Sequence, residues 1–149
     1  MDGCGQLSLP SASKLWFTPD GHWKEPGGYH NYPVSKLIEA ALMLENNGYQ
    51  IFNQYPILLN ASYVMLKYSF PDLTASAFGD TGRPRQSMEC LESAILMADK
   101  YQLPILPDLL DAAIILERAG QYDRSKSGLT GLLCYLPELP KAKSVDNHL

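Results

Sequence analysis

The chain has 149 residues, of which 46% are hydrophobic and 19% are charged, which fits a soluble globular domain with a substantial core. Twelve basic and sixteen acidic residues give a formal net charge of −4, which argues against a general nucleic-acid binder. Cys4, Cys90 and Cys134 lack CxxC spacing. We therefore expect neither a disulfide framework nor a structural zinc site, and we expect Cys90 and Cys134 in the core.

Neither an export signal nor a membrane span is predicted. Residues 1–10 lack the basic start and the apolar run of a signal peptide. No stretch approaches the roughly 20 consecutive apolar residues that cross a bilayer. The sequence therefore predicts no membrane partner.

The first third of the chain leads from a mixed segment through a loop into a helix. Residues 1–19 are a lead-in, of which Lys14–Phe17 resembles the end of a preceding helix. Residues 20–33 are rich in Gly, Pro, aromatic residues and His, which predicts an irregular loop. A helical pattern starts at Ser35, a predicted N-cap, and stops at Asn46-Asn47-Gly48. Its predicted apolar face is Leu37, Ile38, Ala41, Leu42 and Leu44.

Further helices are predicted in the rest of the chain. Proline is favoured in the first turn, so a second helix is expected from Pro56 to about Tyr68. A second irregular loop, residues 75–86, precedes a third helix that Ser87 caps. The predicted buried face of this third helix is Leu91, Ala94, Ile95 and Ala98.

Pro107-Asp108 opens a predicted fourth helix, Gly120 ends it, and Leu129–Leu136 is a weaker fifth. No run shows the alternation of a strand. The expected fold is all-α, with stacked helical hairpins as in an α/α toroid or a solenoid. Residues 20–149 would form part of such a domain. Because the terminal helices lack obvious capping faces, we expect a piece of a larger array.

The loop DGHWKEPGGYHNY, residues 20–32, carries the densest set of chemically active side chains. His22, Glu25, Tyr29, His30 and Tyr32 supply acids, bases and hydrogen-bond donors for proton transfer. The flat, amphipathic rings of this loop suit sugar rings. The predicted ligand-contacting residues of the loop are Trp23, Tyr29, His30, Asn31 and Tyr32.

Two other interpretations of this loop stay open. In the first, its aromatic rings plug the end of the helical bundle and its histidines are surface residues. In the second, His22, His30 and Glu25 hold a metal, although their spacing matches no compact zinc motif. The favoured prediction includes neither a metal nor another cofactor.

The second loop, residues 79–85, places Asp80 close to Arg83 and Arg85. The planar guanidinium of arginine pairs with a carboxylate or a sulfate through two hydrogen bonds. In the alternative interpretation, contacts between the arginines and the aspartate only hold this loop in place beside a helix N-terminus. Asn60-Ala61-Ser62 matches a glycosylation sequon, but it falls within a predicted helix and we discount it.

The run PDGHWKEPGGYHNYPVSKLIEA, followed about fifty residues later by AFGDTGRPR, resembles the heparinase II/III-like polysaccharide lyases from about Phe17 to Pro140. The resemblance implies an N-terminal α/α toroid followed by antiparallel β-sheet domains, which this chain lacks and which would be its partners in the parent protein. It also implies a periplasmic or secreted location. The implied substrate is a uronate-containing polysaccharide, glycosaminoglycan-like, cleaved by β-elimination.

By this resemblance His22 would abstract the C5 proton of the uronate. Glu25, if protonated or hydrogen-bonded, would help to neutralise the uronate carboxylate. Tyr29 and Tyr32 would line the subsite, and Asp80 would organise the second loop.

The chain departs from the family where Glu25 precedes a proline instead of a glycine. The family also uses a catalytic tyrosine, expected near the second loop, but residues 75–85 contain none. Tyr63 and Tyr68, on the preceding helix, are predicted to be poor substitutes. The alternative function is therefore a non-catalytic helical module that binds carbohydrate or packs against another domain.

Overall fold

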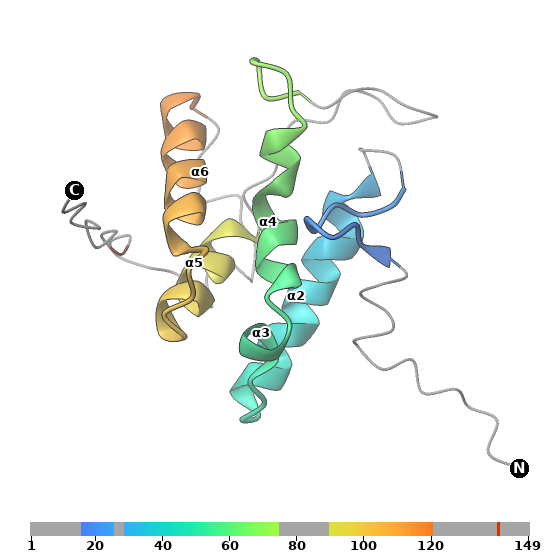
Figure 1. The fold of residues 1–149 in the computed structure, drawn as a ribbon, viewed down its shortest axis with the longest axis vertical. Helices are drawn as coiled ribbons and strands as arrows, with labels where there is room; N and C mark the ends of the chain where they lie inside the picture. Colours follow the sequence, from blue (N-terminus) through green and yellow to red (C-terminus); the bar gives the residue numbers. More distant parts are fainter. Residues whose placement is uncertain (1–15, 26–28, 75–89, 121–139, 141–149) are drawn as a thin grey trace, which may run out of the picture. The chain divides into compact units, whose positions relative to one another are not determined.

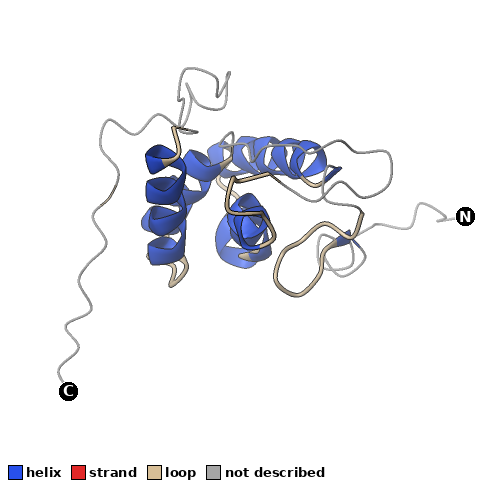
Figure 2. Cartoon of the chain, turned by 90° about the horizontal axis from the view of Figure 1, so that it is seen from above, coloured by secondary structure: helices blue, strands red, loops and turns tan. Residues whose placement is uncertain are grey.

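The computed structural model describes residues 16–25, 29–74, 90–120 and 140, and within these ranges the chain consists of helices and loops (Figure 2). The predicted all-α class is confirmed. The chain divides into two compact units, residues 1–86 and residues 87–149. No helix in the described part is both long and apolar enough to cross a membrane.

The first unit is built on two antiparallel helices, α2 (Asn31–Asn46) and α4 (Ile57–Lys67), which pack against each other (Figure 1). A short helix, α3 (Ile51–Gln54), lies between them in sequence and packs on α2. Glu45 is buried at the end of α2 and accepts a hydrogen bond from the Phe52 backbone N–H. This carboxylate therefore satisfies an N–H group that the first turn of α3 leaves without an intrahelical partner.

The second unit contains the hairpin of α5 (Leu91–Lys100) and α6 (Leu106–Arg118), which contact each other. All four residues of the predicted apolar face of α5 are buried. Gly120 follows α6 with φ +65°, and its N–H donates to the Glu117 carbonyl. The predicted stop at this glycine is confirmed, because a left-handed residue ends a helix at little steric cost when it is glycine.

The predicted start of the first helix at Ser35 is wrong. Helix α2 begins at Asn31, and the Ser35 hydroxyl donates to the Tyr32 carbonyl one turn earlier. Pro33 lies in the first turn of α2. Backbone N–H groups have no intrahelical acceptor there, so the N–H that proline lacks is not missed. The predicted apolar face is partly wrong, since Leu44 is exposed whereas Glu45 is buried.

Other predictions fall at the limits of the described ranges. Helix α4 follows Pro56 closely, as predicted, and α5 is described only from Leu91. Cys90 is buried, as expected. The predicted cap at Ser87, the fifth helix at 129–136, Cys4 and Cys134 lie outside the described residues.

Candidate functional site

The candidate site is built on a tight turn in the segment that precedes α2. The Lys24 N–H donates to the Trp16 carbonyl, Phe17 and Trp23 form an antiparallel bridge, and the Thr18 N–H donates to the His22 carbonyl. These contacts define a hairpin turn, residues 16–25. Trp16 has helical conformation, in line with the predicted end of a preceding helix, whereas Phe17 already belongs to the turn.

Gly21 allows the hairpin turn to lie directly on α4. Its φ is +94°, and a Cβ atom built at this position would be 2.8 Å from both the Ala61 nitrogen and the Asn60 Cβ atom. A side chain is therefore excluded by contact as well as by backbone conformation. Because Gly21 lies against α4, its neighbours Asp20 and His22 are also held close to this helix.

His30 anchors the hairpin turn from the other side, just before α2. Only 1% of its surface is exposed. Its Nδ1 accepts the Trp23 N–H at 2.9 Å, and its Nε2 lies 2.8 Å from the Ala61 carbonyl oxygen. Since a carbonyl only accepts, Nε2 carries the proton and the ring is neutral. Burial is the main cause that lowers the pKa of His30 from 6.5 to about 4.

These contacts change the role that the sequence suggested for His30. Both ring nitrogens are bound to backbone atoms, so His30 orders the site instead of facing a ligand. For the same reason the alternative metal set of His22, Glu25 and His30 does not form. Within the described ranges, no group of three or more His, Cys, Asp or Glu side chains is arranged to hold a metal ion.

The half-buried His22 ring lies between two other rings. Its centroid is 5.2 Å from the centroid of His30 and 5.0 Å from that of Tyr68, which meets it edge to face. Tyr68 follows the last residue of α4 and is exposed. The expectation that Tyr68 is a poor substitute for a catalytic tyrosine is therefore not supported by its position, because the fold brings it to His22.

Asp20 completes this polar cluster of Asp20, His22 and Tyr68. The Tyr68 hydroxyl donates to Oδ2 of Asp20, and the Thr18 hydroxyl donates to Oδ1. These two hydrogen bonds lower the pKa of Asp20 to about 2, and the bond from Thr18 has the larger effect. The carboxylate raises the pKa of Tyr68 above its usual value of 10, mainly through the hydrogen bond. The phenol therefore holds its proton more tightly than an ordinary tyrosine does.

Glu25 contacts a different partner. Its Oε2 accepts the Trp23 indole N–H at 3.0 Å, whereas the His22 ring lies against Tyr68 and His30. The Glu25 carboxylate is an acceptor in this contact. A role in neutralising a second carboxylate would require it to carry a proton.

The aromatic residues of the segment differ in exposure. Trp23 is buried, with Trp16 stacked on one face at 5.2 Å and Phe17 meeting it edge-on at 5.4 Å. The sequence suggested that Trp23 stacks on a sugar. The structure leaves neither face of its ring available for this, because the ring is buried between Trp16 and Phe17. The exposed indole is that of Trp16, a residue that sequence reasoning did not select.

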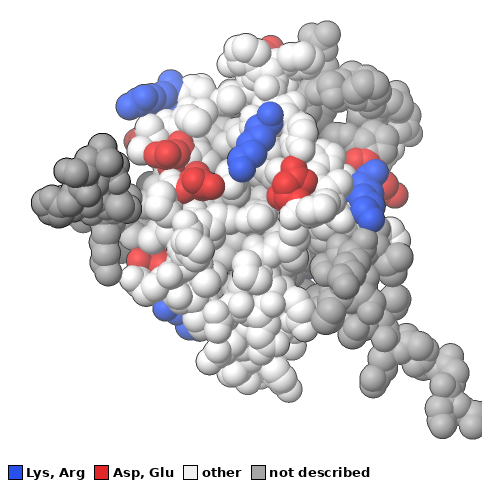
Figure 3. All heavy atoms as spheres, in the orientation of Figure 1, with Lys and Arg blue, Asp and Glu red and all other residues white. Residues whose placement is uncertain are grey.

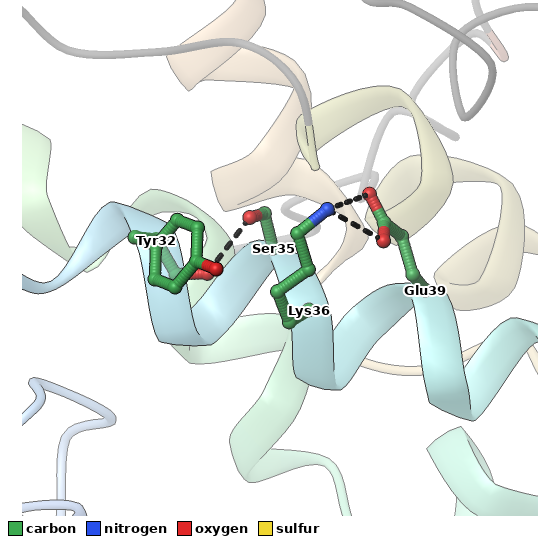
Figure 4. A network of polar contacts seen from close by, with 4 residues as sticks. All are labelled: Tyr32, Ser35, Lys36 and Glu39. Atoms are coloured by element: carbon green, nitrogen blue, oxygen red, sulfur yellow. Dashed lines mark hydrogen bonds and ion pairs between the residues drawn. The ribbon is translucent and has the colours of Figure 1, made fainter.

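The predicted subsite residues near the start of α2 are accessible to different degrees. Tyr29 is exposed, Asn31 is half-buried, and Tyr32 is 74% exposed. Figure 4 shows Tyr32 on the first turn of α2, with its carbonyl bound by Ser35 and with the Lys36–Glu39 ion pair of 2.9 Å on the next turn. Tyr29 and Tyr32 are therefore accessible to solvent at the start of α2.

Charged side chains form no single-sign cluster on the face shown in Figure 3, where basic and acidic side chains of the described residues are interspersed. The predicted anion-binding residues Asp80, Arg83 and Arg85 lie outside the described residues. Their roles remain predictions from the sequence.

Comparison of the chain with protein-family models, curated proteins and solved structures finds no match. The polar cluster and the local likeness of the loop are therefore the features from which a function can be inferred.

Proposed function

We propose that the chain is part of a polysaccharide lyase that cleaves a uronate-containing polymer by β-elimination. The observation that carries the proposal is the polar cluster, in which the ring centroids of His22 and Tyr68 are 5.0 Å apart and the Tyr68 hydroxyl is bound by Asp20. An imidazole beside a protonated phenol supplies the base and the acid that an elimination requires.

In the proposed reaction a neutral His22 ring removes the C5 proton of the uronate. The electron pair forms the C4–C5 double bond, and the bond between C4 and the glycosidic oxygen breaks. The Tyr68 hydroxyl donates its proton to the departing oxygen. A phenol is protonated at neutral pH even at its ordinary pKa, and it is a stronger acid than the alcohol that leaves. The hydrogen bond to Asp20 holds the Tyr68 hydroxyl in place until that step.

The remaining parts of the site are assigned by the likeness to the family. Tyr29 and Tyr32 would line the subsite, and Glu25, if protonated or hydrogen-bonded, would help to neutralise the uronate carboxylate. Arg83 and Arg85 have no counterpart in the likeness; in the sequence they are candidates to pair with a carboxylate or a sulfate. The pairs α2–α4 and α5–α6 would be hairpins of an α/α toroid. We place the protein in the periplasm or outside the cell, where such polymers are found.

The direct test uses the natural gene product that contains these residues. It is incubated with heparan sulfate, hyaluronan and alginate, and the ultraviolet absorbance of the unsaturated uronate product is followed. Activity on at least one polymer is expected, and His22→Ala should lower it by about 10²–10⁴-fold, the usual contribution of a positioned base. Met43→Ala, at an exposed position of α2, is the control and should leave it unchanged.

The absence of unsaturated product with all three polymers would contradict the proposal. Activity that survives both His22→Ala and Glu25→Ala would instead favour the alternative of a non-catalytic module for this segment.

A further inference from the structure

The stacked indoles of Trp16 and Trp23 are not used by the proposed elimination chemistry. Their centroids are 5.2 Å apart and their planes are inclined by only 9°. Trp23 is buried, whereas Trp16 is 46% exposed. Trp23 therefore supports one face of Trp16 from below, and solvent reaches the exposed indole.

Several contacts hold this aromatic stack of Trp16, Phe17 and Trp23 in place. Phe17 packs edge-on against Trp23 and pairs with it across the hairpin turn. The Trp23 indole N–H is bound by Glu25, and the Trp16 carbonyl accepts the Lys24 N–H at 2.9 Å. Because the rings are ordered before a ligand arrives, binding to Trp16 loses little side-chain entropy.

We propose that Trp16 is a platform for a pyranose ring of the polysaccharide, outside the polar cluster. The face of a pyranose carries C–H groups that are polarised by the ring oxygens, and these groups suit the electron-rich face of an indole. Glu25, at the edge of the stack, provides an acceptor for sugar hydroxyls. The proposal takes its substrate class, a uronate polymer, from the proposed function.

The location of the platform favours a polymer over a single sugar. His22 directly precedes Trp23, and consecutive Cα atoms are about 3.8 Å apart. The aromatic stack and the polar cluster therefore share one hairpin turn, and the proposal requires that one extended polymer contacts both. The sugar on Trp16 would hold the polymer while a neighbouring uronate lies at His22 and Tyr68.

The 149-residue chain offers a selective probe, because Trp16 and Trp23 are the two tryptophans of its sequence. Intrinsic tryptophan fluorescence therefore reports on this stack alone. Titration with hexasaccharides of heparan sulfate, hyaluronan and alginate should give a saturable change in emission with at least one of them. Calorimetry then gives the dissociation constant of that hexasaccharide for wild type and variants.

Three substitutions test whether binding requires an aromatic ring at position 16 or only a large side chain. Trp16→Ala and Trp16→Leu should each weaken hexasaccharide binding about tenfold, since both remove the aromatic face and leucine still covers Trp23. Trp16→Tyr should retain binding within about threefold of wild type. Tyr49→Ala, at another exposed aromatic position, should have no effect. If the alanine variant does not fold, the leucine and tyrosine variants decide.

The proposal is overturned if no hexasaccharide changes the emission, or if Trp16→Leu binds as tightly as wild type. Its failure can be told apart from failure of the lyase proposal, because binding requires no turnover. Hexasaccharide binding that depends on Trp16, without formation of unsaturated product, would support the platform proposal and contradict the lyase proposal. Turnover with an unchanged KM in Trp16→Leu would keep the lyase and reject the platform.

Discussion

The hairpin turn of residues 16–25 and the helical hairpin of α5 and α6 are ordered by different forces. The helical hairpin depends on a periodic set of buried apolar side chains such as Ile95 and Leu109, and many apolar residues could serve there. The hairpin turn depends on single hydrogen bonds of the His30 ring and on the glycine at position 21, for which few other residue types can substitute. Substitutions in the helices should therefore reduce stability alone, whereas those in the turn should also alter the site.

The largest effect on stability is expected from Leu109→Ala in α6. Leu109 is completely buried, so its truncation leaves a cavity and should lower the free energy of unfolding by about 3–4 kcal/mol. Ile115, on the same helix, is 50% exposed, and Ile115→Ala should change stability by less than about 0.5 kcal/mol. Urea denaturation measures both, and equal losses would contradict the assigned core.

A somewhat smaller effect is expected when the pH is lowered, through His30. Its folded pKa of about 4 lies below the ordinary 6.5, so the unfolded chain binds the proton first and stability falls as the pH drops from about 6.5 to about 4. The full loss is up to about 3 kcal/mol, and it is complete below the folded pKa. Below that pH this group contributes no further change.

His30→Gln keeps a donor for the Ala61 carbonyl but does not titrate in this range. Urea unfolding measured at several pH values should show a shallower loss of stability for this variant than for wild type. Identical pH profiles would contradict the buried, neutral assignment of His30.

Gly21→Ala tests how the hairpin turn lies on α4. The new Cβ atom would meet α4 at 2.8 Å in a backbone conformation with positive φ, which should cost about 1–3 kcal/mol. Gly48 also has positive φ, at +87°, but a Cβ there would meet nothing within 4 Å. Gly48→Ala should therefore cost only about 1 kcal/mol. Thermal denaturation of the two variants measures the difference, and equal costs would contradict the contact of Gly21 with α4.

The smallest effect on stability is expected at Asp20 and Tyr68, because both side chains are exposed. The depressed pKa of Asp20 contributes stability above about pH 3.8 that is lost as the pH falls through about 2. The raised pKa of Tyr68 contributes stability below about pH 10 that is lost as the pH rises through the folded value.

Asp20→Asn should leave stability almost unchanged and return the pKa of Tyr68 toward 10, because the charged acceptor is lost. Titration of the Tyr68 ring signals by nuclear magnetic resonance measures this change. Asp111→Asn, at an exposed position of α6, is the control. An unchanged Tyr68 titration in Asp20→Asn would contradict the hydrogen bond.

The helices could be predicted from the sequence because their signals are local. Gly48 and Gly120 follow α2 and α6 closely, and Leu91, Ala94, Ile95 and Ala98 repeat with a helical period and are buried. The short helix α3 was missed, since its first turn is completed by Glu45 of another helix.

The loop that carries His22 could also be predicted from its Gly- and His-rich composition, but the other members of the polar cluster and the contacts of the site could not. Tyr68 reaches Asp20 across 48 residues, and no local pattern shows such a pairing. Trp16 precedes the Gly- and His-rich segment, residues 20–32, from which the site is predicted, so the composition of that segment does not indicate it. His30 was misassigned because its two backbone partners come from Trp23 and from Ala61 of α4.

The central claim is that His22 and Tyr68 act as one catalytic unit. A double-mutant cycle tests it most directly, with turnover of a uronate polymer measured for wild type, His22→Ala, Tyr68→Phe and the double variant. Each single substitution should lower the rate by about 10²-fold or more, and the double variant should be about as slow as the slower single variant. A double variant whose loss equals the product of the two single losses would contradict the claim.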